Sequence, residues 1–126
     1  MNILDNLKYT ENHEWVLIED NVATIGITDY AQRELGDIVY VDVDTLGDLL
    51  NIDDVFGSVE AVKTVSDLFM PVQGKVVEVN QKLEEQPELV NQDPYLNGWI
   101  IKVELDVSSD NPKLLSSTQY KEHIGL

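Results

Sequence analysis

The fold follows from one stretch in the middle of the chain, Phe56-Gly57-Ser58-Val59-Glu60-Ala61-Val62-Lys63-Thr64-Val65-Ser66-Asp67-Leu68-Phe69. Two runs within and beside it, Val55 to Val62 and Val65 to Phe69, are rich in β-branched and apolar residues at partly alternating positions, which predicts two strands. Because so few residues separate the runs, the strands are expected to pair as a hairpin. Such a hairpin would project Lys63 outward from its tip.

Further short strands are expected on both sides of this hairpin, because β-like runs recur along the chain between turn-forming residues. They are Glu14 to Ile18, Val22 to Ile27, Ile38 to Asp44, Lys75 to Val79 and Trp99 to Leu105. The polar, proline-containing stretch from Gln81 to Gly98 is expected to be loop with at most one helical turn.

Two short helices are expected at the periphery. The first covers residues 29–35, after Thr28 as its N-terminal cap. The second covers residues 117–124, because Ser116 followed three residues later by Gln119 matches a capping box. Many short strands with only peripheral helices indicate a mainly β fold, an antiparallel sandwich or flattened barrel.

Composition narrows the possible functions. The chain has 126 residues and a formal net charge of −16, from eight Lys or Arg against 24 Asp or Glu. This length fits a single domain over residues 1–126. The negative charge repels phosphate backbones and anionic lipids, so neither nucleic acid nor membrane is an expected partner. No apolar run could span a bilayer, and Met1 to Asp5 do not resemble a signal peptide.

The sequence carries no recognisable catalytic or metal-binding pattern. Cysteine is absent, which excludes disulfides, thiolate metal ligands and cysteine nucleophiles. Neither His13 nor His123 lies at zinc-ligand spacing from another good ligand, so no metal site is expected. There is no glycine-rich phosphate loop and no nucleophile elbow. His13 is expected to order the N-terminal segment, and Trp15 and Trp99 are expected in strands of the core.

One lysine is unusual in its surroundings. Lys63 is the only basic residue between Arg33 and Lys75, among nine carboxylates. A single exposed amine at a hairpin tip is what an enzyme needs to acylate one lysine and no other. An ordinary solvated lysine would satisfy the same pattern, since lysine is nearly always exposed. Spacing alone leaves both interpretations open.

The residues around this lysine closely resemble a known segment. Glu60 to Asp67 is similar to the lipoyl-lysine segment of the glycine cleavage H-protein family, and further blocks are similar in the same order. These blocks are Tyr9 to Val16, Val22 to Gln32, Leu35 to Val39, Pro71 to Asn80, Pro87 to Tyr95 and Gly98-Trp99. Ala61 stands where the family often has Ser, and the residues flanking the lysine are not the methionines typical of biotin carriers.

This resemblance implies a carrier rather than an enzyme. Lipoic acid would be bound covalently through an amide to Lys63, at the tip of a lipoyl hairpin over about residues 55–70. The implied fold is a lipoyl-domain-like hammerhead β-sandwich. The implied partners are a pyridoxal-phosphate glycine decarboxylase, a folate-dependent aminomethyltransferase, dihydrolipoyl dehydrogenase and lipoylating enzymes. A monomer in the bacterial cytoplasm is expected, or in the mitochondrial matrix for a mature eukaryotic chain.

The resemblance also carries roles for four other residues. Glu14 and Asp67 match family positions that contact the amine of the aminomethyl-loaded arm, and Asn12 is the neighbouring polar position. Glu60 is a candidate for recognition by the lipoylating enzyme, with a solvated or cross-strand role equally open.

Two other functions remain open at this stage. An H-like protein can serve as a lipoyl relay, donating its modified arm to other lipoyl proteins through the same lysine. The chain could also be an unmodified acidic binding domain or minor hydrolase of the same fold. Full activity of a Lys63→Arg variant would favour that last class, because Arg cannot accept the lipoyl amide.

Overall fold

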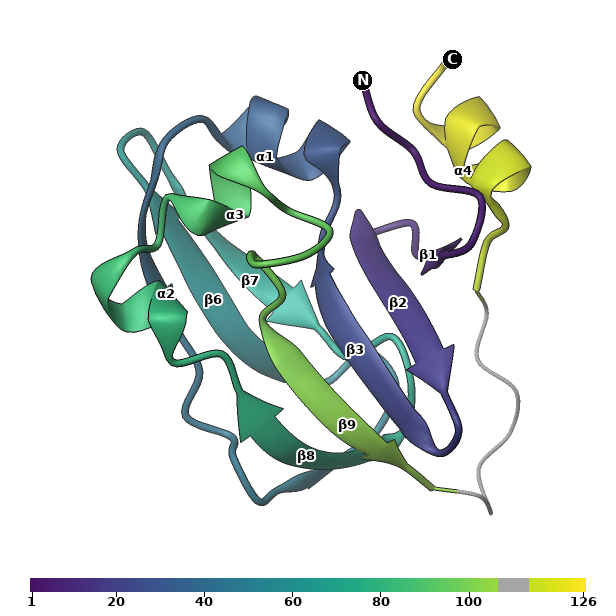
Figure 1. Cartoon of the computed structure of the whole chain (residues 1–126), viewed down its shortest axis with the longest axis vertical. Coiled ribbons are helices and arrows are strands. Elements are labelled where there is room, and N and C mark those ends of the chain that lie inside the picture. The colour runs from purple at the N-terminus through teal and green to yellow at the C-terminus, as the bar shows by residue number, and fades with distance from the viewer. Residues whose placement is uncertain (107–113) are drawn as a thin grey trace.

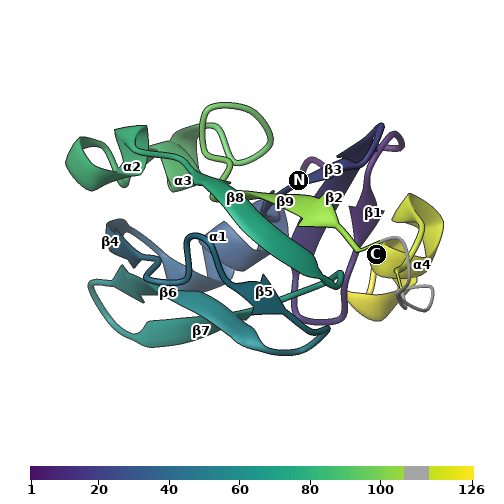
Figure 2. The ribbon, with the colours of Figure 1, turned by 90° about the horizontal axis from the view of Figure 1, so that it is seen from below.

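Two antiparallel sheets pack face to face in the computed structural model, which describes residues 1–106 and 114–126 (Figures 1 and 2). The larger sheet has the order β1 (Lys8–Tyr9), β2 (Glu14–Glu19), β3 (Val22–Ile27), β9 (Ile101–Leu105), β8 (Gly74–Val79) and β5 (Leu49–Leu50). The smaller sheet has the order β4 (Ile38–Asp42), β6 (Val55–Ala61) and β7 (Val65–Phe69). The predicted mainly β sandwich is confirmed, and over the described residues the sheets stay separate rather than closing into a barrel.

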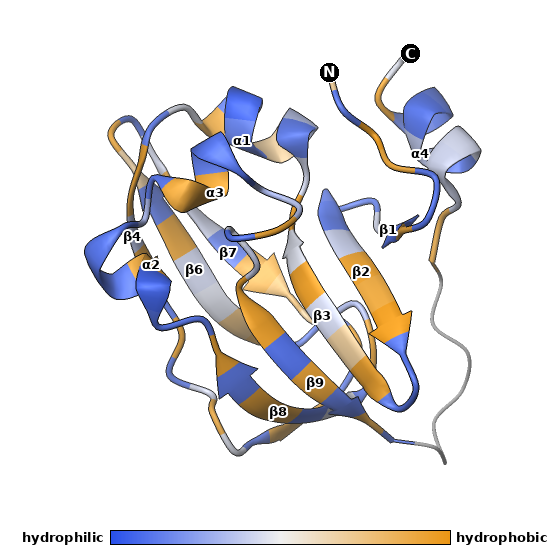
Figure 3. Ribbon diagram, in the orientation of Figure 1, coloured by the Kyte–Doolittle hydropathy of each residue, from blue (hydrophilic) through white to orange (hydrophobic). Residues whose placement is uncertain are grey.

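The core lies between the sheets because their strands alternate apolar and polar residues. In β9, Ile101 and Val103 are fully buried while Lys102 and Glu104 face outward, and the same alternation is visible in Figure 3. Phe56 and Val59 of β6 enter this core from the opposite sheet. Full burial of each such side chain contributes about 1.5–3 kcal/mol, so alternation in two sheets is enough to hold the layers together.

The two predicted helices are present with their predicted caps. Helix α1 (Asp29–Leu35) begins after Thr28, whose hydroxyl accepts a hydrogen bond from the Ala31 N–H. Helix α4 (Ser117–His123) begins with the complete Ser116–Gln119 capping box and ends one residue earlier than predicted. Both helices form where local capping chemistry satisfies the free N–H groups of the first turn.

The stretch predicted as loop contains two single-turn helices, α2 (Lys82–Glu85) and α3 (Leu89–Gln92). Each turn buries one apolar side chain, Leu83 in α2 and Val90 in α3, against the core. A single buried residue leaves no helical periodicity in the sequence, which is why the pattern predicted a loop with at most one turn.

Several strand ends also differ from the prediction. The strand predicted to begin at Trp99 begins at Ile101, because the Asn80 side-chain amide donates to the Trp99 carbonyl, at 2.7 Å. Trp99 is therefore half-buried outside the strand, with the Lys102 ammonium 5.0 Å from its ring centre. Strand β4 ends two residues early, at Asp42. The two-residue strands β1 and β5 were too short to predict.

The C-terminal helix packs beside the N-terminal segment, so both ends of the chain lie together (Figure 1). Tyr120 of α4 is fully buried and stacks on Tyr9 of β1, with ring centres 4.7 Å apart. Leu115 forms a bridge with Tyr9, and Trp15 belongs to the same buried cluster. The prediction that Trp15 is a core residue is confirmed.

Candidate functional site

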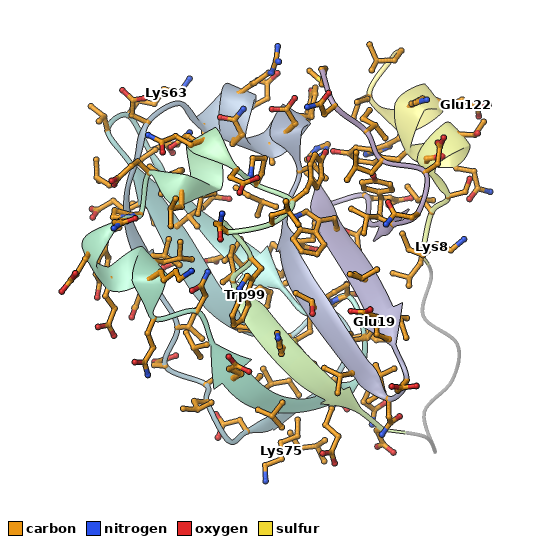
Figure 4. All side chains as sticks on the ribbon, in the orientation of Figure 1. Lys8, Glu19, Lys63, Lys75, Trp99 and Glu122 are labelled. Atoms are coloured by element: carbon orange, nitrogen blue, oxygen red, sulfur yellow. The ribbon has the colours of Figure 1, made fainter. Side chains whose placement is uncertain are left out.

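The β6–β7 hairpin places Lys63 at its tip. The last paired residues are Glu60 and Val65, and the Ala61 N–H donates to the Thr64 carbonyl at 2.8 Å to close the turn. Lys63 is exposed, and its amine points away from the rest of the chain (Figure 4). The hairpin and its exposed lysine therefore lie where the sequence predicted them.

The base of this tip is held by neighbouring elements. The Val62 N–H donates to the carbonyl of Asp37, the residue before β4, at 3.1 Å. The Asn91 amide of α3 donates to the Gly36 carbonyl at 2.8 Å, which fixes the connection between α1 and β4. A Cβ placed on Gly36 would lie 3.7 Å from Lys63 Cε, so the lysine stem passes over this connection. The backbone is held while the amine remains free.

The tip presents apolar surface as well as the amine. Val62 is 77% exposed and Val65 is 61% exposed. Glu60 is exposed in β6 and pairs with Tyr40 on one side and Val65 on the other. Exposed apolar side chains grouped beside polar ones are typical of protein contact surfaces, so the tip is suited to contact with another protein.

Glu14 is a buried carboxyl group, only 1% exposed, at the start of β2. Its Oε1 accepts a hydrogen bond from the Thr10 hydroxyl at 2.8 Å, and its Oε2 accepts one from the Phe69 N–H at 3.0 Å. Burial raises the pKa of Glu14 to about 7, with a smaller upward contribution from the charge of Asp53, while the two hydrogen bonds oppose the shift. Since Phe69 ends β7, this carboxyl group joins the larger sheet to the β6–β7 hairpin.

An open pocket of about 410 Å³ lies over Glu14. Its lining residues are Thr10, Glu11, Asn12, Glu14, Ile52, Asp53, Met70, Pro71, Leu114, Leu115 and Gln119. The structure thus brings Asn12 and Glu14 together, as the sequence predicted. Asp67 is exposed on β7 and does not line this pocket.

The pocket and the lysine lie at different ends of the hairpin. Phe69 is six residues beyond Lys63, which corresponds to about 20 Å along an extended strand. A group attached to Lys63 would therefore have to lie back along the hairpin to reach Glu14.

Sequence reasoning named Asn12 and Glu14 of this pocket and missed its other lining residues, among them the two that act on Glu14, Thr10 and Asp53. Thr10 precedes Glu14 by four residues, and no local pattern indicated that its hydroxyl would bond the carboxyl group. Asp53 has a left-handed backbone, with φ of 73°, in the turn before β6. In a chain with 24 acidic residues, no single aspartate stood out from the others.

The rings of the two histidines lie close together, with centres 5.6 Å apart. His13 has φ of 67°, and its Nδ1 is 2.9 Å from the Tyr120 hydroxyl, so it ties the N-terminal turn to α4. Burial, followed by the neighbouring His123, lowers the pKa of His13. Among the described residues no three potential metal ligands cluster. In the same part of the chain, no helix has the length and hydropathy needed to cross a membrane.

Comparison with known proteins agrees with this geometry. The family model of the glycine cleavage H-protein matches residues 7–125. Glycine cleavage system H proteins of Staphylococcus epidermidis and Staphylococcus haemolyticus are 55% and 56% identical over 125 residues, 99% of each chain. A crystal structure of a glycine cleavage system H protein from Mycobacterium marinum matches with a TM-score of 0.89 at 35% identity, covering 98% of this chain and 100% of that one. The chain therefore belongs to the glycine cleavage H-protein family, the non-catalytic carrier component of that system.

Proposed function

We propose that Lys63 carries lipoic acid through an amide and that the chain is the lipoyl carrier of a glycine cleavage system. The observation that carries this proposal is the single exposed amine on a braced hairpin tip. Acylation of the amine removes its positive charge and leaves a long, flexible arm. When bound, the lipoyl group supplies the redox-active sulfur that the cysteine-free chain lacks. No protein thiol would compete with it.

The carrier unit comprises residues 1–126 and shuttles an aminomethyl group between enzymes. It takes the group from the pyridoxal-phosphate glycine decarboxylase and presents it to the folate-dependent aminomethyltransferase. Dihydrolipoyl dehydrogenase then restores the oxidised arm. Lipoylating enzymes recognise the hairpin tip, with Glu60 as part of the recognised surface. Membership of the family and the exposed tip support these assignments.

Glu14 is the docking residue for the amine of the loaded arm. Its carboxyl group lies in a pocket that shields it from most solvent, where attraction to an ammonium group is stronger than in water. Asn12 contributes a polar side chain at the pocket edge. Asp67 acts outside the pocket, on the path along β7 between Lys63 and Phe69.

The net charge of −16 suits a monomeric carrier in the bacterial cytoplasm that meets several partners in turn. Long-range repulsion limits self-association, and complementary basic surfaces on partner enzymes would speed encounter. The bacterial origin of the relatives described above supports the cellular assignment.

Mass spectrometry tests the attachment site. The purified chain is incubated with lipoate, ATP and a lipoylating enzyme, and its intact and peptide masses are measured. We expect one lipoyl increment, located at Lys63. The Lys63→Arg variant should show none, whereas Lys75→Arg, which replaces another exposed lysine in β8, should be modified normally. A modified Lys63→Arg variant, or an unmodified parent chain beside a modified reference lipoyl domain, would contradict the proposal.

A further inference from the structure

The pocket over Glu14 contains a second carboxylate. Asp53, in the turn before β6, lines the pocket and is exposed, so it lies at the mouth while the buried Glu14 lies at the floor. The Asp53 N–H donates to the carbonyl of Met70 at 2.9 Å, and Met70 itself lines the pocket. Asp53 therefore belongs to a turn that is fixed to the end of the lipoyl hairpin.

The floor carboxylate is held in a defined orientation. The Thr10 hydroxyl accepts a hydrogen bond from the Glu14 N–H at 3.2 Å, which leaves its own hydrogen for Glu14 Oε1. The Phe69 N–H occupies one acceptor site on Oε2. A carboxylate offers about four acceptor sites, so each oxygen retains capacity for another donor from the pocket.

No cationic side chain of the described residues lines this pocket. Besides Glu14 and Asp53 it holds the acidic Glu11, and its other lining residues are neutral. Two carboxylates at the floor and mouth of this pocket, with no protein cation among the described lining residues, favour a positively charged guest.

We propose that Asp53 is a second binding residue for the cationic amine of the loaded arm, acting together with a Glu14 carboxylate that Thr10 positions. The ligand class is a small primary ammonium group, whose three N–H donors and positive charge suit a pocket lined by two carboxylates. This inference rests on the proposed function only for the natural ligand, the amine of the aminomethyl-loaded arm. The affinity of the pocket for an ammonium group does not depend on it.

The protonation of Glu14 agrees with this assignment. Burial and then Asp53 raise the pKa of Glu14 to about 7. The other ionisable groups around it are Glu11 at the pocket wall and Tyr120 of α4, which feels the charge of Glu14. A bound ammonium group supplies the missing positive charge and favours the ionised carboxylate. Binding of the ammonium group should therefore strengthen as pH rises through 7. Below pH 7, binding should release the proton of the Glu14 carboxyl group.

Methylammonium chloride is the probe, titrated at pH 8 into the full-length unmodified chain while amide NMR signals are recorded. We expect saturable shifts at the Phe69 N–H and at residues of the pocket. Asp53→Asn should weaken binding about tenfold, as expected for one charge-assisted hydrogen bond. Asn is suitable because it tolerates the left-handed backbone of this position.

The matched control is Asp44→Asn, which removes one exposed negative charge outside the pocket. It should leave the affinity within about twofold, because exposed charges beyond about 8–10 Å are largely screened at physiological salt. An equal loss of methylammonium affinity in Asp53→Asn and Asp44→Asn would overturn the inference, and so would the absence of saturable shifts in the parent chain. Because the chain is unmodified, these outcomes are independent of whether Lys63 is lipoylated.

A second pair of variants tests the positioning role of Thr10. Thr10→Val removes a hydrogen bond that favours ionised Glu14, so it should raise the pKa of Glu14, while Thr10→Ser should restore it. Asp53→Asn removes a negative charge and should lower the same pKa. Side-chain carboxyl ¹³C shifts measured from pH 5 to pH 9 report these changes, and shifts of the same sign in Thr10→Val and Asp53→Asn would contradict the assignment.

Discussion

Glu14 illustrates how one residue can serve a site at a cost in stability. Its carboxyl group is buried, and burial raises its pKa from 4.5 to about 7. The group therefore ionises near neutral pH rather than near pH 4.5. A group that binds its proton more tightly in the folded state makes the fold less stable as pH rises between those two values. The shift corresponds to about 3 kcal/mol above pH 7. A permanent structural role would not require an ionisable group here.

Replacing Glu14 by Gln should remove this pH dependence. The amide can still accept from the Phe69 N–H and bond the Thr10 hydroxyl, so the local contacts are kept. We expect Glu14→Gln to gain stability over the parent chain by up to about 3 kcal/mol as pH rises from 4.5 to 8. The measurement is the difference in free energy of unfolding between the two chains by urea titration across this range. A constant difference would show that Glu14 does not titrate as stated.

At the level of elements, the β6–β7 hairpin is supported by a helix outside the two sheets, α3. Asn91 of α3 accepts a hydrogen bond from the Ile38 N–H of β4 and donates to the Gly36 carbonyl and to Gln32 of α1. This one side chain therefore joins α1, α3 and β4 beneath the tip. Helix α3 therefore has a structural purpose, because it carries this support.

Removal of that support should loosen the tip selectively. Asn91→Ala should lower the free energy of unfolding by about 1–3 kcal/mol, the cost of unsatisfied partly buried groups. It should also speed amide hydrogen exchange at Val62, whose N–H donates to Asp37. Ser116→Ala is the control, since loss of that helix cap costs about 1 kcal/mol at the other side of the molecule. Equal exchange at Val62 in both variants would contradict a specific brace.

For the whole molecule, the net negative charge sets the long-range electrostatic field. Eight basic and 24 acidic residues leave a negative surface, and within the described residues Arg33 and Asp29 form the one ion pair. The acidic residues therefore act mainly through the long-range field rather than through local pairs. Such a field accelerates encounter with basic partner surfaces and opposes contact between copies of the chain.

Added salt should therefore slow the encounter of the lipoylated chain with a partner enzyme. Between about 0.01 M and about 0.15 M salt the screening length falls from about 30 Å to about 8 Å. We expect the second-order rate of reoxidation of the lipoylated chain by dihydrolipoyl dehydrogenase to fall about tenfold or more over this range. Free dihydrolipoamide, which has no net charge, serves as the control substrate and should react at a nearly constant rate. The same salt response for both substrates would rule out steering by the carrier's charge.

The sequence by itself determined the features that depend on neighbouring residues. Alternation predicted the hairpin with Lys63 at its tip, and side-chain oxygens at Thr28 and Ser116 predicted where the two helices begin. These features repeat with the period of a strand or need only a cap three residues away, so they can be read locally. The single-turn helices lack such a period, and the sequence predicted one turn at most where the structure has two.

Only the tertiary structure decided the chemistry around Glu14. Phe69 lies 55 residues from Glu14 in the chain, and the pocket also takes residues from the turn before β6 and from the segment that leads into α4. Contacts at such separations depend on how the two sheets and the C-terminal helix pack, and no local pattern encodes them. Burial, which raises the pKa of Glu14, is likewise a property of the packed molecule, and so the sequence could name Glu14 while only the fold could bring Thr10 and Asp53 to it.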